Sequence, residues 1–482
     1  MSGLRTFDSI CDACLQPVPS HVECAGRDVL LVRNCPQHGR REYRTSRNGQ
    51  AYLNFDQFRL ETMPPSGQGP EPSKSFFFIT PSCNQGCSYC LNEANEFRYF
   101  DDYDAATFAQ QLAQSKLRKI ALVGGEPFAH PRFWELVQVV RSHGKSLQLY
   151  TNGLALADRA LVQRLVEAAG PDCEIFMTFE GFEPELYEWV GAGRVRERKL
   201  AALKNLEEFQ LATTFHQTVP PEPYQSAIVS QVQAARELAQ YALEHGYVRA
   251  LAFQSIVAIG GARGLSAQEV TSVDLTMDRV LESLPVVVTR SEIYALQKIF
   301  ALLSGVMRLP RCPHLQFAVL VREAGSWHGL DRYLHIRRLN RRLDARLRGR
   351  RWSRAEMLWA LIVDTLASVR WRQLPRLMRL ALQVWPVLRG GLDASRIPRN
   401  ILPVAASTVC DRFNYDADLV PGCDKRVFST VEGRVIAELA AEMSLRQMRQ
   451  RAEHEDDDTL RMPSRLVMPR AAPGHRPEQP HG

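Results

Sequence analysis

The feature that most constrains this chain is a group of three cysteines, Cys83, Cys87 and Cys90, at C-x3-C-x2-C spacing. They follow directly after the apolar run 76–79, so we expect them on a loop that leaves a strand. Three thiolates at this spacing can bind three irons of a 4Fe–4S cluster and leave the fourth iron open to another ligand. Structural zinc sites and ordinary ferredoxin clusters use four protein ligands. The trio therefore predicts a catalytic cluster, with structural zinc as the alternative.

This spacing, with Tyr89 directly before the last cysteine, resembles the radical S-adenosyl-L-methionine (SAM) superfamily. The resemblance implies that the open iron binds SAM, and that an electron from the cluster cleaves SAM to a 5′-deoxyadenosyl radical. That radical takes hydrogen from an unactivated C–H bond of the substrate, while the protein positions the cofactor and excludes side reactions. It also implies that Cys83, Cys87 and Cys90 are the catalytic ligands, with Tyr89 beside the cofactor.

After the cysteines, short β-like runs alternate with amphipathic helical stretches. The predicted strands are 76–79, 119–123, 146–150, 174–179, 212–219 and 248–257, and the predicted helices are 104–117, 131–143, 157–169, 196–209 and 226–245. This rhythm predicts βαβ units and a parallel sheet. Six units match the partial barrel that the resemblance implies. We therefore predict an α/β fold: a partial (β/α)6 parallel barrel with a small N-terminal metal-binding module and a mainly helical C-terminal domain.

Polar motifs follow several of these strands at the ends where such sheets bind ligands. The run Gly124–Gly125–Glu126–Pro127 resembles the family motif that receives the methionine amino group, with Glu126 as acceptor or as a residue that shapes the turn. Its glycines would let the backbone approach a ligand closely. By the same resemblance Glu180 contacts the cofactor and Ile259 contacts adenine, with a surface acid as the alternative for Glu180. Asn152 would bind the cofactor or close its own turn.

A second set of metal-ligand residues lies near the N-terminus: Cys11, Cys14, Cys35 and His38. Two short chelating turns about twenty residues apart are typical of a zinc-knuckle or rubredoxin-like site. Zinc fits this ligand set best and iron is the alternative. Cys24 lies between the turns, as a bystander or alternative ligand. The stretch resembles the N-terminal module of radical SAM enzymes that include the archaeal tetraether lipid synthases, which join lipid tails through carbon–carbon bonds.

The same group shares a C-terminal cysteine domain, and Cys312, Cys410 and Cys423 follow its pattern. The family's further cysteine is replaced here by residues 437–439. The resemblance therefore implies three ligands for a second Fe–S cluster. Three alternatives stay open: an open iron, a fourth ligand from His314 or Cys173, or no cluster.

Positive charge is concentrated between Arg332 and Arg389, where fifteen arginines and three acids give a local charge of +12. The whole chain carries +7, so the remainder carries −5. Apolar residues recur at helical spacing, four tryptophans are interleaved, and prolines divide the stretch into about three helices. Basic amphipathic helices with tryptophan suit an anionic membrane surface. The alternatives are a solvated face of an ordinary bundle and nucleic acid, the partner we expect least.

We predict five segments: a Cys/His metal-binding module (1–60), a linker (61–74), the radical SAM core (75–300), an Arg/Trp-rich helical domain with auxiliary cysteines (301–450) and a disordered tail (451–482). Residues 1–30 contain no apolar signal region, and the apolar run 357–363 is shorter than the about twenty residues that cross a bilayer. Eleven cysteines without an export signal favour metal binding in a reducing compartment. We expect a cytoplasmic protein with peripheral contact at the inner face of the membrane.

These observations predict a radical SAM enzyme that abstracts hydrogen from an unactivated C–H bond, on a lipid or other small molecule, with carbon–carbon or carbon–sulfur bond formation. The resemblance implies an electron donor such as ferredoxin or flavodoxin. One alternative keeps the enzyme class but modifies a peptide or RNA. Another is a non-catalytic iron–sulfur electron carrier or redox sensor, which would need neither the Gly-Gly-Glu-Pro motif nor a ligand cleft.

Overall fold

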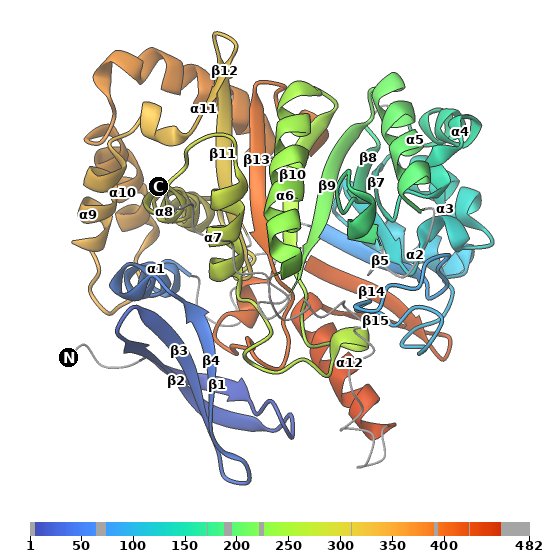
Figure 1. The fold of residues 1–482 in the computed structure, drawn as a ribbon, viewed down its shortest axis with the longest axis horizontal. Coiled ribbons are helices and arrows are strands. Elements are labelled where there is room, and N and C mark those ends of the chain that lie inside the picture. Colours follow the sequence, from blue (N-terminus) through green and yellow to red (C-terminus); the bar gives the residue numbers. More distant parts are fainter. Residues whose placement is uncertain are drawn as a thin grey trace, which may run out of the picture.

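The computed structural model describes residues 5–63, 74–170, 172–187, 195–220, 226–309, 311–389, 394–423 and 425–454 (Figure 1). Most of the predicted linker, 64–73, and most of the predicted tail, 455–482, lie outside these ranges. Helix α1 (Gly49–Glu61) precedes the first of these two gaps, and α12 (Ala440–Glu453) precedes the second. The predicted segment bounds stay predictions.

Six strands of the central sheet pair in chain order, each parallel to the next. They are β5 (Lys74–Thr80), β6 (Lys119–Gly124), β7 (Ser146–Thr151), β8 (Glu174–Thr178), β9 (Ala212–Val219) and β10 (Val248–Ser255). Every predicted strand therefore exists, with ends within about two residues of the expected positions. The α/β fold with parallel strands in βαβ units is confirmed.

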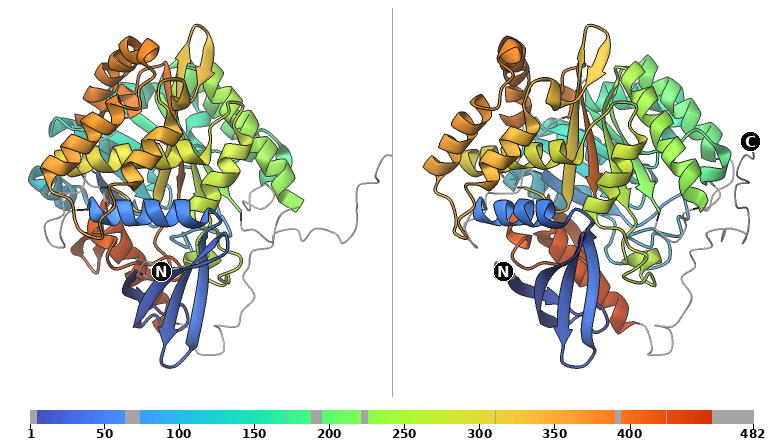
Figure 2. Two further views of the ribbon diagram at one scale, coloured as in Figure 1. Left: turned by 90° about the vertical axis from the view of Figure 1, so that its left-hand side faces the viewer. Right: turned by 60° about the vertical axis from the view of Figure 1, so that its left-hand side comes forward.

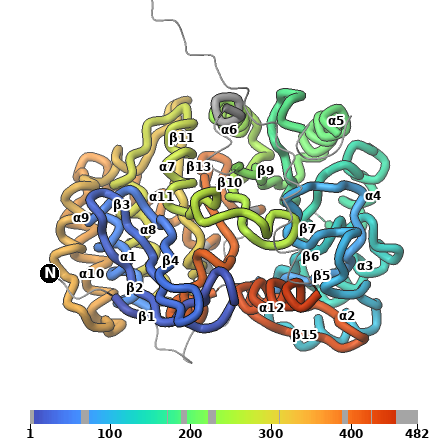
Figure 3. The backbone as a smooth tube through the Cα atoms, turned by 60° about the horizontal axis from the view of Figure 1, so that its bottom comes forward, coloured from blue at the N-terminus to red at the C-terminus, as the bar shows by residue number. Residues whose placement is uncertain are grey.

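Five crossover helices lie along the outside of the curved sheet (Figure 3). They are α2 (Ala105–Gln114), α3 (Phe133–Ser142), α4 (Arg159–Ala169), α5 (Val195–Glu208) and α6 (Ser226–Glu244). In α3 the buried residues Phe133, Leu136, Val137 and Val140 follow the helical period, so one face packs on the sheet. Helix α4 begins where the Asp158 carboxylate accepts the backbone N–H groups of the first turn.

The C-terminal part contributes strands to both edges of the same sheet. They are β11 (Leu315–Glu323), β12 (Ser326–His328), β13 (Ile401–Ser407), β14 (Lys425–Val431) and β15 (Arg434–Leu439). Strand β13 pairs parallel with β10 at one edge, and β14 pairs parallel with β5 at the other. The eleven-stranded order is β12-β11-β13-β10-β9-β8-β7-β6-β5-β14-β15. The C-terminal part is helical as predicted, but these strands, which the sequence did not reveal, make it continuous with the barrel.

The remaining helices of the C-terminal half are α7 (Val273–Ser283), α8 (Arg290–Met307), α9 (Ile336–Asp344), α10 (Arg354–Leu366) and α11 (Leu374–Arg389). The arginine-rich segment forms three of them, α9 to α11, and Pro386 lies inside α11 instead of ending it. Arg342 and Arg346 pair with the buried carboxylate of Asp364, which joins α9 to α10. Part of the arginine excess is therefore structural, because a buried carboxylate needs paired donors.

Helices α10 and α11, with the turn between them, expose apolar side chains that we call the outer apolar face. Its members are 43–72% exposed: Leu358, Trp359, Ile362, Leu366, Trp371, Met378, Leu382 and Trp385. Exposed arginines on the same elements include Arg370, Arg372, Arg376 and Arg379. Within the described ranges, no helix combines the length and apolar character that crossing a bilayer requires.

The N-terminal module is an antiparallel meander of β1 (Thr6–Ile10), β2 (Pro17–Ala25), β3 (Asp28–Cys35) and β4 (Gly39–Ser46). It lies against one end of the barrel, with α1 between it and the helices of the C-terminal half (Figure 2). The fully buried Asp274 of α7 accepts hydrogen bonds from Ser46 Oγ at 2.7 Å, Asn48 Nδ2 at 2.8 Å and Gln316 Nε2 at 2.9 Å. This carboxylate joins the module to α7 and β11.

Candidate active site and metal centres

The loop after β5 brings the cysteine trio to the wall of a large cavity inside the curved sheet. Cys83, Cys87 and Cys90 are each partly exposed, and all three line the cavity, which has a volume of about 670 Å³. A turn that joins Cys90 N–H to Cys87 C=O at 3.1 Å holds the last two close in the chain. The sequence prediction placed these residues on such a loop, and the structure brings all three to one wall.

The glycine pair at the end of β6 packs directly on the start of this loop. A Cβ atom on Gly124 would stand 2.3 Å from Thr80 O, and one on Gly125 would stand 2.2 Å from Ser82 O. Gly124 also has φ +147°, which L side chains rarely adopt. The Gly125 and Glu126 N–H groups donate to Thr80 O at 2.7 Å and to Ser82 O at 2.8 Å. The close approach that we expected toward a ligand is therefore made to the cysteine loop itself.

A second glycine pair, after β10, packs on the other end of the loop. A Cβ atom on Gly260 would stand 2.3 Å from Cys90 O, and one on Gly261 would stand 2.3 Å from Ser88 O. The Gly261 N–H donates to Cys90 O at 3.0 Å. The loop is thus held between two pairs of residues that have no side chains.

The residues at this wall fit a 4Fe–4S cluster with SAM. Among the described residues the trio does not form a tight single-ion group, which suits thiolates that each bind a different iron. Two buried cavity atoms, Gln85 Nε2 and Glu180 Oε1, have no hydrogen-bond partner in the described part of the chain. Leaving such atoms unpaired costs about 1–3 kcal/mol each. A polar cofactor bound here would satisfy them.

The thiols need a metal to lose their protons. Burial raises the pKa of the Cys83 thiol to about 11, and burial also raises the pKa of Cys90. At neutral pH both are protonated in the absence of metal, so iron binding must release these protons.

Glu126 shapes its turn and lies away from solvent. The carboxylate is fully buried and accepts from Thr151 Oγ1 at 2.8 Å, Asn152 N at 2.8 Å and Phe128 N at 3.2 Å. Burial raises its pKa to about 7 despite these hydrogen bonds. Of the two roles expected for Glu126, the structure therefore shows the turn-shaping one. Pro127, next in the motif, is buried at the start of a short 3-10 turn.

Asn152 combines a turn role with contact to the cysteine loop. Its Oδ1 accepts from Leu154 N at 3.0 Å, and its Nδ2 donates to Asn84 Oδ1 at 2.7 Å and lies 3.9 Å from Cys83 Sγ. It also lines the cavity. A hydrogen bond to a metal ligand orients that ligand and adjusts the properties of the metal centre.

The other expected cofactor contacts all reach the cavity. Glu180 lines it, with Oε2 bound to Lys199 Nζ at 2.6 Å in a fully buried pair, so it is not a surface acid. Tyr89 lines it beside the cysteine trio. Ile259 lines it and packs with Ile10 of the N-terminal module. Their roles toward SAM stay predictions.

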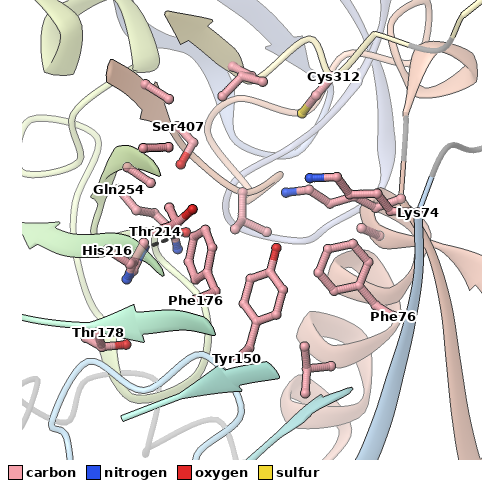
Figure 4. A pocket seen from close by; sticks show the side chains of 18 of the residues that line it. Lys74, Phe76, Tyr150, Phe176, Thr178, Thr214, His216, Gln254, Cys312 and Ser407 are labelled. Carbon is pink, nitrogen blue, oxygen red and sulfur yellow. Dashed lines mark hydrogen bonds between the residues drawn. The ribbon is translucent and has the colours of Figure 1, made fainter. Parts of the chain in front are cut away.

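The rest of the cavity has an aromatic wall that the sequence analysis missed (Figure 4). The rings of Phe76, Tyr150, Phe176 and His216 follow one another across β5, β7, β8 and β9, with centroid distances of 5.2, 4.2 and 5.4 Å. His216 hydrogen-bonds Gln254 Oε1 at 3.2 Å, and burial lowers its pKa to about 4. The sequence signal for this wall was the alternation along each strand, because residues two apart on one strand point to the same face of the sheet.

The N-terminal ligands form a compact metal site. The ligand atoms of Cys11, Cys14, Cys35 and His38 all lie within 4.8 Å of one another. Cys35 Sγ is 3.5 Å from His38 Nδ1 and Cys14 Sγ is 3.9 Å from Cys35 Sγ. This donor set, four ligands from two turns, matches tetrahedral zinc. Cys24 is exposed and donates to Gly26 O, so it lies outside the site as a bystander.

The C-terminal cysteines also converge. Burial, and then the nearby thiols of Cys423 and Cys312, raise the pKa of Cys410. His314 Nε2 lies 2.9 Å from Cys410 Sγ, and burial lowers the pKa of this histidine to about 3, so the imidazole is neutral. Cys173 instead lies in the main core among apolar side chains. Of the two fourth ligands considered, only His314 is in contact with this group, and a second cluster stays a prediction.

The glycine contacts predict the effect of adding one methyl group. In Gly125→Ala the new Cβ meets backbone rather than a flexible side chain, so the cysteine loop must shift. We expect this variant to bind less than half the iron and sulfide of the wild type after anaerobic reconstitution. Gly246→Ala, whose Cβ has ordinary contact with Arg399 at 3.7 Å, is the control and should bind the full amount. Equal iron in both variants would contradict this account of the loop.

The N-terminal site predicts a metal that does not depend on the cysteine trio. Elemental analysis of Cys35→Ser should show the loss of one bound zinc or iron per chain, because one of four ligands is gone. Cys24→Ser should keep it. Metal that survives Cys35→Ser would show that the site is not a metal centre.

Comparison with known proteins agrees with this geometry. Residues 77–227 match the model of the radical SAM superfamily, and residues 4–47 match that of the HMPTM N-terminal zinc ribbon domain. The chain is 25% identical over 206 residues to 7,8-dihydro-6-hydroxymethylpterin dimethyltransferase of Methanocaldococcus jannaschii, covering 37% of this chain and 40% of that protein.

Two further relatives are similar over shorter segments. PqqA peptide cyclase of Gluconobacter oxydans is 29% identical over 174 residues, 35% of this chain and 48% of that protein. GTP 3′,8-cyclase of Chlorobaculum tepidum is 36% identical over 94 residues, 19% of this chain and 28% of that protein. The chain thus spans less than half the length of each relative. With a cysteine loop, a parallel barrel and a Cys/His site that all match, the chain contains a radical SAM superfamily domain and an N-terminal zinc ribbon.

Proposed function

We propose that this protein abstracts hydrogen from an unactivated C–H bond on an apolar chain, such as that of a lipid, and that a carbon–carbon or carbon–sulfur bond then forms at that carbon. One observation carries the proposal. A single cavity runs from the cysteine trio to a broad aliphatic wall made by α8, β11 and α11. The superfamily domain supports the chemistry, and the wall supports the substrate class.

When bound at Cys83, Cys87 and Cys90, the cluster and SAM supply a 5′-deoxyadenosyl radical. The chain's own residues place and protect that chemistry. The two glycine pairs hold the cysteine loop in position, Asn152 donates toward Cys83 Sγ, and the Glu180–Lys199 pair keeps a carboxylate oxygen at the cavity wall. Apolar walls keep solvent and solutes out of the cavity, which limits side reactions of a reactive intermediate.

The aliphatic wall supports an apolar substrate. Its aliphatic members are Leu296, Ile299 and Leu303 of α8, Val319 of β11, and Val384 and Val387 of α11, and the rings of Phe300 and Phe317 line the same part of the cavity. Each buried CH₂ group of a substrate would contribute about 0.8 kcal/mol on such a surface. A small polar substrate would gain little from it.

The outer apolar face supports delivery of that substrate from an anionic membrane. Trp371 and Leu382 are 65% and 72% exposed, and exposed arginines flank them. Tryptophan and arginine together suit the interface of an anionic bilayer, where each basic residue contributes about 1 kcal/mol. Helix α11 contributes both to the cavity and to the outer apolar face, because Val387 lines the cavity while Leu382 and Trp385 are exposed. We expect a small electron-transfer protein, such as a ferredoxin or flavodoxin, to reduce the cluster.

The reaction is tested by SAM cleavage. Anaerobically reconstituted, reduced protein should release 5′-deoxyadenosine from SAM, measured by chromatography, and Cys87→Ala should release none above background because one cluster ligand is missing. Cys24→Ala, which removes a cysteine outside every predicted metal group, should behave as the wild type. An intact protein that binds iron but releases no 5′-deoxyadenosine would favour an iron–sulfur electron carrier.

Membrane contact is tested by sedimentation with vesicles. The wild type should bind phosphatidylglycerol vesicles and detach as salt rises, with little binding to phosphatidylcholine alone. Replacing Trp371 and Leu382 together by serine should weaken binding at least about tenfold, since each loses about 1.5–3 kcal/mol of apolar burial. Val287→Ser removes an 87% exposed apolar residue elsewhere and serves as the control. No binding to acidic vesicles at moderate salt would remove the support for membrane delivery.

A further inference from the structure

Two lysines from opposite ends of the chain lie side by side at the cavity wall. Lys74 opens β5 and Lys425 opens β14, and their Cα atoms are direct partners across these parallel strands. Both line the cavity. Neighbouring parallel strands are about 4.8 Å apart, so partner residues present their side chains to the same face. Figure 4 shows Lys74 reaching toward the middle of the cavity, across from Tyr150.

The local charge balance favours an anion here. Glu180 is the one carboxylate among the described lining residues, and it forms its ion pair with Lys199 at 2.6 Å. The ammonium of Lys425 lies 5.8 Å from the Phe76 ring centroid, within reach of a cation–π attraction to the aromatic wall. An anionic group between the two lysines would gain charge-assisted hydrogen bonds from both side chains.

The surroundings of the pair specify what kind of anion fits. On one side the pair adjoins the aromatic wall, where Phe76 lies 5.2 Å from Tyr150. The same cavity continues to the aliphatic wall of α8 and α11. A ligand that uses both features has an anionic group at one end and an apolar chain at the other. Free inorganic anions would use the lysines but not the walls.

We propose that Lys74 and Lys425 bind the anionic group, a carboxylate or a phosphate, of a chain-bearing amphiphile whose apolar part lies along the aliphatic wall. The inference rests on the proposed function for its substrate class, and it adds the group by which that substrate is recognised. It also sets the orientation of the substrate, because anchoring one end determines which carbon of the chain lies near the cysteine trio.

The test is equilibrium binding to the anaerobically reconstituted full-length protein, by calorimetry, below the micelle concentration of each probe. The probes are laurate, dodecyl phosphate, dodecanol and inorganic phosphate. We expect at least one of the two anionic amphiphiles to bind about tenfold or more tightly than dodecanol, and inorganic phosphate to bind far more weakly. Preference for laurate or for dodecyl phosphate identifies the anionic group.

The variants isolate the lysines. Lys74→Met with Lys425→Met keeps the apolar stems and removes two charges, so binding should become equal for the anionic probes and dodecanol. Lys74→Arg with Lys425→Arg should keep the preference. Lys116→Met with Lys204→Met removes two exposed charges outside the cavity and should bind as the wild type.

Three results would overturn the inference: equal binding of dodecanol and both anions by the wild type, a preference that survives the double methionine variant, or inorganic phosphate binding as tightly as dodecyl phosphate. These results are independent of SAM cleavage. If the wild type releases no 5′-deoxyadenosine yet prefers anionic amphiphiles, the proposed reaction fails and the binding site stands. If it cleaves SAM without that preference, the binding site fails alone.

Discussion

Direct backbone contact between two glycine pairs and one loop is the constraint on which the candidate site depends. Gly124–Gly125 lie at the end of β6 and Gly260–Gly261 come after β10, and they touch opposite ends of the segment that carries the cysteine trio. A methyl group at any of the four would meet a backbone oxygen at 2.2–2.3 Å. The loop therefore has no room to move toward either strand. A site that must hold three thiols for one cluster needs this kind of rigid support.

The curvature of the sheet then determines what shares the cavity with that loop. Parallel pairing of β13 with β10 and of β14 with β5 extends the six-stranded core at both edges. The inward-facing residues of these added strands, Ser407 and Lys425 among them, line the same space as Cys83. Cys312 reaches it from the start of β11. Elements separated by more than three hundred residues thus contribute to a single cavity.

Much of this arrangement could be predicted from the sequence where the pattern was local. The six parallel strands and five crossover helices follow from apolar periodicity, and the ribbon ligands follow from their spacing. Where the answer depended on the fold, the sequence left alternatives open. Glu126 accepts three hydrogen bonds within its own turn and the next, which is one of its two expected roles, and Cys173 lies in the core, away from the C-terminal cysteines. The pairing of Lys74 with Lys425 needs a register that no local pattern contains.

The buried guanidinium of Arg33 has a consequence for how the metal centres behave together. It lies on β3, two residues before the ribbon ligand Cys35, and donates to the carbonyl of Phe413. Asp411 in that segment accepts from Ala258 N at 3.0 Å, just before the glycine pair that holds Cys90. A continuous chain of contacts therefore joins the zinc-ribbon site to the cluster loop. Arg33 is therefore a shared support of both sites, and loss of its side chain would loosen the packing of each.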